Sequence, residues 1–591
     1  MCGFTVVARC DGLRHDDRDA LIACNAQMPY RGPDGQGLWT DHSVGFAHVR
    51  LSIIGLENGA QPIVSDEGDL VLVCNGEIYN HRTLRKSLES KGYKFKTLSD
   101  SEVILHLYRE HRDDLINHID GMFAFVLYDK KERKIIAARD HAGKKPIYWS
   151  LLSNGIVFSS EVKAIAKCFL RNLEIDFNLI QQVQENRYSI SKAETYITGI
   201  NKIAPGHLLV SNLDDPGRPI HRTWYRRTVE AGFDGSYDEA VAQTREILFN
   251  AVAKRLESEV PLGLLLSAGI DSAAILCISK ALGHDLRSFS AGYAESSHAD
   301  ESDEAAALCA ELGTPFEKVV LAAPDLMTEL QHILAVLDEP NADPAIFPQW
   351  LLYKEIHARG YTVLLSGLGG DEVFFGYPPH NQGASGAPRS AHLKSERVKR
   401  LLTQLVTSKN PQRIELLRFL FRRALHSKSL FRRPILDEVR DRVGQIGHAG
   451  VELPDDNVDE LGLDIDKVYR FLIDVYLPNN GLFLSDKLAM AHSIEVRCPF
   501  VDRSLRAFVD TLPANYKFPR GDAKGLLKDA LRGIVPERVL NRKKTGFTPP
   551  SNYLQDVVEA YRPAFFQGRV STFAHVVTDH FCAEHSTRAS V

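Results

Sequence analysis

The chain has 591 residues, of which 44% are hydrophobic and 25% are charged, and its formal net charge is -5 at pH 7. This length predicts two to four folding units with sizeable cores, and the weak negative charge excludes a broad electrostatic surface for nucleic acid. The N-terminus has no signal-peptide pattern, and no run of about 18 apolar residues predicts a membrane span. The nine cysteines are scattered without a C-x-x-C pair, so neither a zinc cage nor a disulfide framework is indicated. We therefore expect a reduced, cytoplasmic protein.

A cysteine directly follows the initiator methionine, in the stretch MCGFTVV. One interpretation is a small apolar residue at the start of a strand. The other is that Met1 is removed, which leaves Cys2 with a thiol and a free α-amino group. Such an amine can take the thiol proton near neutral pH. The stretch alone leaves both interpretations open.

Short β-type runs separated by turn signals fill about the first 170 residues. They cover residues 3–9, 44–54, 70–76, 123–129, 134–140 and 155–160. Only a few helical patterns interrupt them, notably at residues 81–92 and 101–111. This pattern predicts a mostly antiparallel α+β layer structure.

Four short motifs stand out in this region: RGPDGQG at 31–37, RLSI at 50–53, NGEIYN at 75–80 and SDSEV at 99–103. Each has an ordinary structural interpretation. The first is good turn chemistry, NGE follows a strand as a hairpin turn does, and SDSE is typical of a helix N-terminus.

The pattern changes after a polar stretch that we interpret as a linker, residues 211–236. Residues 237–258 have helical periodicity, and the apolar run 260–266 is followed by a small-residue loop and a helix. The stretch YTVLLSGLGGDE at 361–372 repeats this arrangement. Apolar strands that alternate with helices predict a parallel, doubly wound sheet. Residues 378–477 are helical and irregular, and they support no finer prediction.

The loop in LLLSAGIDSAAIL, residues 264–276, places small residues between a buried strand and a helix. Backbone N–H groups of such a loop, together with the helix N-terminus, form an anion site. The pattern is not a Walker loop, because G-x-x-x-x-G-K-[ST] is absent. An ordinary strand–loop–helix junction is the alternative interpretation.

Taken together and in this order, the N-terminal motifs resemble the glutaminase domain of class II glutamine amidotransferases, an N-terminal-nucleophile fold of αββα layers. The resemblance implies that Cys2 attacks the side-chain amide of glutamine. It also implies that Asn75 and the backbone N–H of Gly76 form an oxyanion hole, since a tetrahedral intermediate needs preorganised donors.

The same resemblance implies that Arg50 holds the carboxylate of glutamine. It assigns the ammonium group of glutamine to Glu77 and Asp100. An arginine fork and paired carboxylates match the two charged ends of an amino acid.

The loop of the second half resembles the S-G-G-x-D-S pyrophosphate loop of enzymes that split ATP between its α- and β-phosphates. Ser267, Gly269, Asp271 and Ser272 match this motif, and Ala268 replaces its first glycine. If that position needs a positive φ, the alanine costs about 1 kcal/mol and its methyl group crowds the phosphates.

Three further stretches, residues 366–377, 485–502 and 525–547, complete a resemblance to the asparagine synthetase family. The resemblance implies domains at 2–210 (glutaminase) and 237–565 (ATP-pyrophosphatase-type synthetase), followed by a tail at 566–591. It implies ATP and Mg²⁺ as cofactors, and glutamine, ATP and a carboxylate acceptor as substrates, without nucleic acid or membrane partners. A homodimer stays open.

In the synthetase half, the resemblance assigns Asp271 and Asp371 to Mg²⁺, whose preferred ligands are carboxylate oxygens. It assigns Lys487 to the charge that grows on the phosphates and the acyl intermediate. The residues implied in ATP binding are Leu265, Ser267, Gly269, Asp271, Ser272, Ala291, Ser366 and Gly367.

The implied reaction amidates a carboxylate that is activated as an acyl-adenylate, and aspartate is the first expectation for the acceptor. Leu368 weakens it, because asparagine-forming relatives commonly carry glutamate at that position. The alternatives are another carboxylate (a sugar acid, a peptide or a biosynthetic intermediate), or a glutaminase or ATP-binding module without synthetase activity. Asp338 and Glu339, in the stretch LDEP, are either metal or acceptor contacts or parts of a simple turn.

Overall fold

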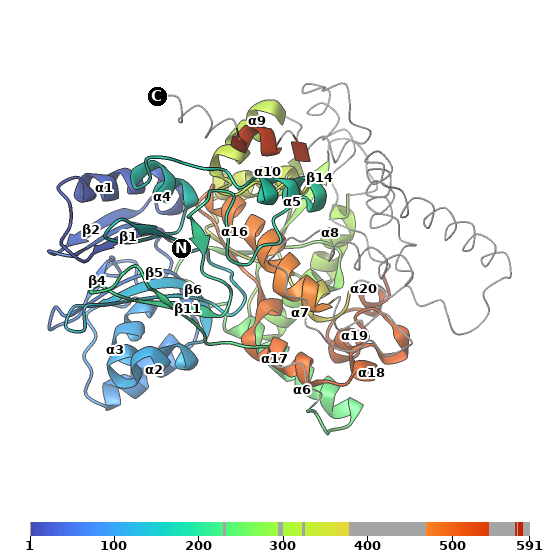
Figure 1. Ribbon diagram of the computed structural model, residues 1–591. Helices are drawn as coiled ribbons and strands as arrows, with labels where there is room; N and C mark the ends of the chain where they lie inside the picture. Colours follow the sequence, from blue (N-terminus) through green and yellow to red (C-terminus); the bar gives the residue numbers. More distant parts are fainter. Residues whose placement is uncertain are drawn as a thin grey trace, which may run out of the picture.

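The computed structural model describes residues 2–227, 232–293, 300–321, 326–376, 469–542, 574–575 and 577–582. The irregular region at 378–468, the predicted end of the synthetase domain and most of the tail lie outside the described residues. Figure 1 shows the sheets of the N-terminal half on one side of the molecule and the helices of the second half beside them.

The first sheet of the N-terminal half has the strand order β10-β8-β9-β1-β3-β2, and all its pairings are antiparallel. Its strands are β1 (Cys2–Arg9), β2 (Gly35–Thr40), β3 (Val44–Arg50), β8 (Tyr148–Leu152), β9 (Gly155–Ser159) and β10 (Asn201–Lys202).

The second sheet is also antiparallel and has the order β12-β11-β7-β6-β5-β4. Its strands are β4 (Ile63–Val64), β5 (Leu70–Ile78), β6 (Gly121–Asp129), β7 (Lys134–Arg139), β11 (His207–Asn212) and β12 (Ile220–Thr223).

The two sheets pack face to face because their strands are apolar on both faces. On β5, Val71 and Val73 belong to the core between the sheets, whereas Leu72 and Cys74 join the core beneath the outer helices. This follows from the alternation of side chains along a strand. Helices α1 (Asp17–Gln27) and α4 (Val162–Cys168) lie over the first sheet, and α2 (His81–Ser90) and α3 (Val103–His111) over the second (Figure 1). The predicted αββα sandwich is confirmed.

The predicted linker needs one correction. Strand β12 lies within residues 211–236 and pairs with β11, with Leu209 opposite His221. Residues 211–223 therefore extend the second sheet, because the Pro/Gly-bearing stretch that suggested a linker forms the turn of a hairpin. Helix α6 (Tyr237–Ala253) then starts the second half, and Ser236 and Glu239 form its capping box.

The second half is built on a parallel sheet of order β15-β14-β13-β16-β17. Its strands are β13 (Leu262–Leu265), β14 (Arg287–Tyr293), β15 (Phe316–Leu321), β16 (Val363–Leu365) and β17 (Glu495–Arg497). In chain order this is 3-2-1-4-5, so the order reverses between β13 and β16. Ligands of open α/β sheets bind outside the carboxyl ends of the strands at such a switch point. The predicted parallel α/β sheet is confirmed.

The remaining helices surround this sheet and cover its faces (Figure 1). They are α5 (Phe177–Asn186), α7 (Ile270–Ala281), α8 (Ser302–Leu312), α9 (Leu326–Val336), α10 (Ile346–Ala358), α11 (Gly370–Val373), α16 (Leu482–Met490), α17 (Arg503–Thr511), α18 (Ala514–Lys517), α19 (Gly525–Leu531) and α20 (Glu537–Leu540). Segments of tighter 3₁₀ helix are η1 (Pro29–Arg31), η2 (Asp100–Glu102), η3 (Arg112–His118), η5 (Pro499–Val501) and η6 (Pro519–Gly521), and η4 (Leu472–Gly481) is a wider π-helix. Among the described residues, no helix combines the length and apolarity needed to cross a membrane.

Candidate active sites

The N-terminal cysteine lies directly beside the asparagine predicted to stabilise an oxyanion. The backbone N–H of Cys2, at the start of β1, donates to Oδ1 of Asn75 on β5 at 3.1 Å. Both residues are buried. The Nδ2 of Asn75 is buried too, and it has no hydrogen-bond partner among the described residues. A buried amide donor without a partner is costly, so this nitrogen is available to a ligand that reaches Cys2.

Gly76 is required by its surroundings. Its φ is +155°, and a Cβ there would lie 2.1 Å from the carbonyl oxygen of Met122 on the neighbouring strand β6. No larger residue fits this approach of two backbones. Burial raises the pKa of the Cys2 thiol above its ordinary value, against the pull of nearby positive charge. The thiol therefore needs a base to become a nucleophile.

A pocket opens over Cys2. Five of the six residues predicted to act on glutamine line it: Cys2, Arg50, Gly76, Glu77 and Asp100. The sixth, Asn75, is not part of this lining and accepts a hydrogen bond from the backbone N–H of Cys2. The guanidinium of Arg50 is held at the pocket wall by the carbonyl oxygen of Gly55 at 2.7 Å. The structure thus brings the predicted glutamine residues together.

Two carboxylates of this pocket, those of Asp100 and Glu77, are held by different partners. An oxygen of Asp100 accepts from the backbone N–H of Ile78 at 2.6 Å. Glu77 lies 2.5 Å from Nη2 of Arg497, which belongs to the second half. Burial raises the pKa of both Asp100 and Glu77, the latter against the attraction of Arg497. The sequence motifs did not identify Arg497 or Glu495 as part of this pocket, although Glu495 also lines it. Both residues lie in the stretch 485–502, which resembles a block of the synthetase half.

The second candidate site lies at the switch point of the parallel sheet. The loop after β13 is closed by Ser272, whose hydroxyl lies 3.0 Å from that of Ser267 and accepts from the Ser267 N–H at 3.1 Å. The loop after β16 packs tightly against it: a Cβ on Gly367 would lie 2.9 Å from the Ser272 nitrogen, and one on Gly370 would lie 2.5 Å from Asp271.

The other residues predicted to contact nucleotide lie around these loops. Leu265 ends β13 and pairs with Phe289 on β14, and Ala291 is two residues further along that strand. Ser366 and Gly269 lie in the two loops themselves. Ala268 is not among the residues with positive φ, so the expected backbone cost of replacing glycine there does not arise.

A lysine that sequence reasoning missed joins the two carboxylates predicted to hold Mg²⁺. Nζ of Lys524 lies 2.5 Å from Asp271 and 2.8 Å from Asp371. Burial opposes the charge of Lys524, but the two carboxylates raise its pKa above the ordinary value. One cation is therefore already shared by both side chains. Two carboxylates at a phosphate loop also suit Mg²⁺, which uses one or two carboxylates and takes its other ligands from phosphate and water.

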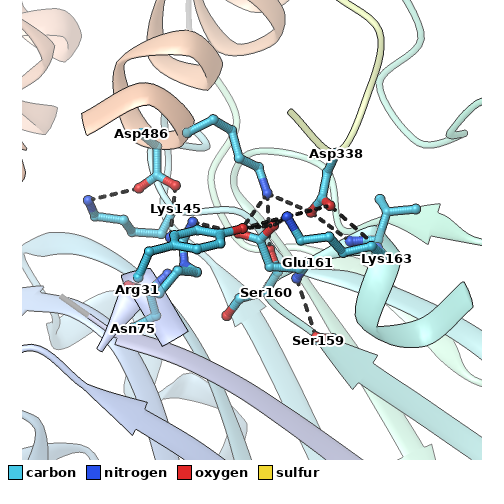
Figure 2. A network of polar contacts seen from close by, with 12 residues as sticks. Arg31, Asn75, Lys145, Ser159, Ser160, Glu161, Lys163, Asp338 and Asp486 are labelled. Carbon is cyan, nitrogen blue, oxygen red and sulfur yellow. Dashed lines mark hydrogen bonds and ion pairs between the residues drawn. The ribbon is translucent and has the colours of Figure 1, made fainter. Parts of the chain in front are cut away.

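Lys487 lies elsewhere, in a buried charge cluster between the two halves. Its Nζ is 2.7 Å from Asp338 and 3.0 Å from Glu161. Figure 2 shows Glu161 in the middle of this cluster, with Arg31 on one side and Lys163 on the other. Burial raises the pKa of Glu161, but the charges of Lys487, Lys163 and Arg31 together hold it well below its ordinary value. The ammonium of Lys487 thus pairs with two carboxylates other than the two that Lys524 joins.

Asp338 and Glu339 form contacts across the same interface rather than a simple turn. Asp338 also accepts from the backbone N–H of Val162 at 2.7 Å, at the start of α4. Glu339 accepts from Lys202 at 2.9 Å and from the hydroxyl of Tyr148 at 3.0 Å. Burial, with Glu161 nearby, raises the pKa of Asp338 to about 6.

Arg31 connects this cluster to Cys2. Its Nε donates to the carbonyl oxygen of Cys2 at 3.2 Å, and its Nη atoms bind Glu161 and Asp486, each at 2.8 Å. Asp486 is on α16 of the second half, so one guanidinium contacts both the backbone of Cys2 and a carboxylate of the other half. Figure 2 shows Arg31 below Asp486. In sequence, Arg31 begins RGPDGQG, which predicted only a turn.

Comparison with known proteins assigns each half of the chain to a family. Residues 1–224 match the model of the glutamine amidotransferase domain, and residues 243–587 match that of asparagine synthase. Asparagine synthetases [glutamine-hydrolyzing] 1 and 3 of Bacillus subtilis are 32% and 30% identical to the chain, each over 93% of it and 87% of the relative. Amidase chry2 of Gibberella zeae is 26% identical over 89% of this chain and 84% of that protein.

The fold, the two sites and these matches define a glutamine-dependent amidotransferase, an enzyme with a glutaminase half and a synthetase half. The asparagine synthase model alone covers more than half of the chain. The chain belongs to the asparagine synthase family.

Proposed function

We propose that this enzyme transfers the amide nitrogen of glutamine to a carboxylate that it activates with ATP. The observation that carries the proposal is the Nδ2 of Asn75, which is buried without a partner among the described residues. It lies beside Cys2, which lines a pocket together with Arg50 and Asp100. That donor would serve an oxyanion formed at Cys2, and the loss of one such donor costs about 3–4 kcal/mol of transition-state stabilisation.

In the first half-reaction, removal of Met1 makes the nitrogen of Cys2 an amine. This amine takes the proton of the thiol, Sγ attacks the side-chain carbonyl carbon of glutamine, and the proton passes to the leaving nitrogen to give ammonia. Water then hydrolyses the thioester to glutamate. Asn75 Nδ2 and the Gly76 N–H stabilise the oxyanion in both steps.

In the second half-reaction, a carboxylate oxygen of the acceptor attacks the α-phosphorus of ATP, and pyrophosphate leaves. Ammonia then attacks the acyl carbon, and AMP leaves. The loops at Ser267 and Ser366 would hold the nucleotide, and Lys524 would bind its phosphates. Mg²⁺ at Asp271 and Asp371 would neutralise pyrophosphate charge.

Aspartate is the first acceptor to test, since the Bacillus relatives are named asparagine synthetases. A different carboxylate is favoured by one observation. Leu368 is half-buried in the loop after β16 and packs against Gly481 within an apolar cluster. A leucine there offers no partner to the α-ammonium of aspartate, and an unpaired buried ammonium costs several kcal/mol.

The test is pyrophosphate release with ATP, Mg²⁺, ammonia and a panel of carboxylates. A productive acceptor should release pyrophosphate and appear as its amide, with ¹⁵N when [amide-¹⁵N]glutamine replaces ammonia. Turnover of no member of a broad panel, with glutamine hydrolysis intact, would contradict the synthetase proposal.

A further inference from the structure

The glutamine pocket of the N-terminal half contains one carboxylate that comes from the other half of the chain. Glu495 begins β17 of the parallel sheet, and it lines the pocket together with Cys2 and Asp100. It is buried, with 1% of its surface exposed. None of the motifs that predicted the pocket contains this residue.

One guanidinium holds Glu495 in place and joins it to the glutaminase. Nε of Arg497 binds Glu495 at 2.6 Å, and its Nη2 lies 2.5 Å from Glu77. Its Nη1 donates to the carbonyl oxygens of Arg255 and Glu257 at 2.9 and 2.5 Å. Arg497 is fully buried, and its hydrogen bonds to these two backbone carbonyl oxygens fix the orientation of the guanidinium. A planar fork of this kind sets two carboxylates in a defined geometry.

Three carboxylates, those of Glu77, Asp100 and Glu495, line this part of the pocket. Arg497 pairs with two of them, Glu77 and Glu495. Burial, together with the neighbouring Glu495 and Asp100, raises the pKa of Glu77 against the attraction of Arg497. Although burial opposes it, Arg497 lowers the pKa of Glu495 to about 2, so this carboxylate is charged in the pocket. The α-ammonium of glutamine would lie among these carboxylates, with Arg50 at the carboxylate end of the same ligand.

The backbone of β17 is anchored to the synthetase sheet. The Ser366 N–H, at the start of the predicted nucleotide loop, donates to the carbonyl oxygen of Arg497 at 2.9 Å. The Glu495 N–H donates to Thr362 at 2.7 Å. Glu495 is therefore positioned by the second half, and the pocket has its full set of carboxylates only when the two halves are docked.

We propose that the synthetase half completes the glutamine site. Glu495 is a specificity residue for the α-ammonium of glutamine, and Arg497 is the positioning residue that holds it beside Glu77. This inference rests on the proposed glutaminase function of the pocket.

The test compares Glu495→Gln with the unmodified enzyme in glutamine hydrolysis. We expect KM for glutamine to rise about tenfold and kcat to change less than about twofold. With 4-carbamoylbutanoate, which is glutamine without its α-ammonium, the variant and the unmodified enzyme should have the same kcat/KM. Ammonia-dependent pyrophosphate release, which does not use the pocket, should be unchanged and reports that the variant folds.

Asp120→Asn is the matched control. It removes a carboxylate that also binds across the two halves, to Lys254 at 2.6 Å, but lies outside the pocket lining. KM for glutamine should stay as in the unmodified enzyme. If Glu495→Gln lowers ammonia-dependent activity as well, Glu495→Asp retains the charge and retracts the carboxylate, and it should still raise KM for glutamine.

An unchanged KM in the Glu495 variants, or an equal penalty with glutamine and with 4-carbamoylbutanoate, would overturn the inference. Failure of the proposed function looks different. In that case the unmodified enzyme itself would not hydrolyse glutamine.

Discussion

Nζ of Lys524 lies 2.5 Å from a carboxylate oxygen of Asp271 and 2.8 Å from one of Asp371. Lys524 is the residue before α19 and has a left-handed backbone conformation, with φ of 55°. It is far in sequence from Asp271 on α7 and from Asp371 on α11, and only the packing of these elements brings the three together. Its ammonium is shared by both carboxylates, which raise its pKa although burial opposes the charge.

The first prediction concerns this lysine. Lys524→Met should lower ammonia-dependent pyrophosphate release by about two orders of magnitude, because a positioned cation near developing negative charge is lost. Glutamine hydrolysis should be nearly unchanged. Lys528→Met, on the same short helix, is the control, and an equal loss in both variants would contradict the assignment.

The second prediction concerns Lys487. Sequence reasoning expects Lys487→Ala to reduce the synthetase rate by two or more orders of magnitude with glutamine hydrolysis unchanged. The buried contacts with Glu161 and Asp338 predict in addition a destabilisation of about 3–5 kcal/mol, since two buried carboxylates lose their partner. Thermal unfolding of Lys487→Ala and of Lys487→Ala with Asp338→Asn separates the two effects. If the single variant unfolds like the unmodified enzyme while synthesis collapses, Lys487 acts at the acyl-adenylate.

The grouping of the residues predicted to bind glutamine could largely be foreseen from the sequence, because they belong to short contiguous motifs. Asn75, Gly76 and Glu77 follow one another on a single strand, and Asp100 sits in its own turn. Their meeting with Cys2 follows from the register of two packed sheets. Arg31 was treated as part of a turn, because the local pattern does not show that its side chain crosses to another domain.

The missed residues share one physical reason. Lys524, Glu495 and Arg497 reach their sites through the order of strands in the parallel sheet and the docking of the two halves, which no local pattern encodes. Lys487 illustrates the opposite case. It lies in the recognised stretch 485–502, but that stretch does not show that α16 packs at the interface between the halves. The Lys487 side chain therefore contacts Glu161 of the N-terminal half.

The third prediction is a pH dependence of stability. His141 is buried, and its Nε2 lies 3.0 Å from the carbonyl oxygen of Val501 across the interface. Burial, with Arg506 nearby, lowers its pKa to about 4, compared with about 6.5 when unfolded. Between these values the unfolded chain binds the extra proton, so stability falls as pH falls from about 6.5 towards 4, by up to about 1.4 kcal/mol per pH unit.

Urea unfolding measured across that range checks this prediction. His141→Gln should reduce the slope of the unfolding free energy against pH by the amount that corresponds to about one proton. His284→Gln, at an exposed position, should leave that slope unchanged. Equal slopes in the unmodified enzyme and His141→Gln would show that the interface histidine is not the group that titrates.

The fourth prediction concerns the acceptor. If aspartate is the acceptor, its apparent affinity should be weak, and Leu368→Glu should raise kcat/KM for aspartate by supplying a partner for its ammonium. If the acceptor is apolar at that point, the same change should reduce turnover. Leu368→Met keeps the contact with Gly481 and is the control. Fast, tight use of aspartate by the unmodified enzyme that is insensitive to Asp338 and Glu339 would show that Leu368 does not report the acceptor.

The most direct test of the account is Cys2→Ala, assayed with glutamine and with ammonia as nitrogen sources. Glutamine-dependent amidation should fall below detection, while ammonia-dependent amidation stays within about twofold, because the two chemistries occupy separate halves. Intact-mass measurement of the unmodified enzyme should show that Met1 is absent, and Cys10→Ala should behave as the unmodified enzyme. Continued glutamine hydrolysis by Cys2→Ala, or full activity of a protein that retains Met1, would contradict the central claim that Cys2 and its own amine release the ammonia.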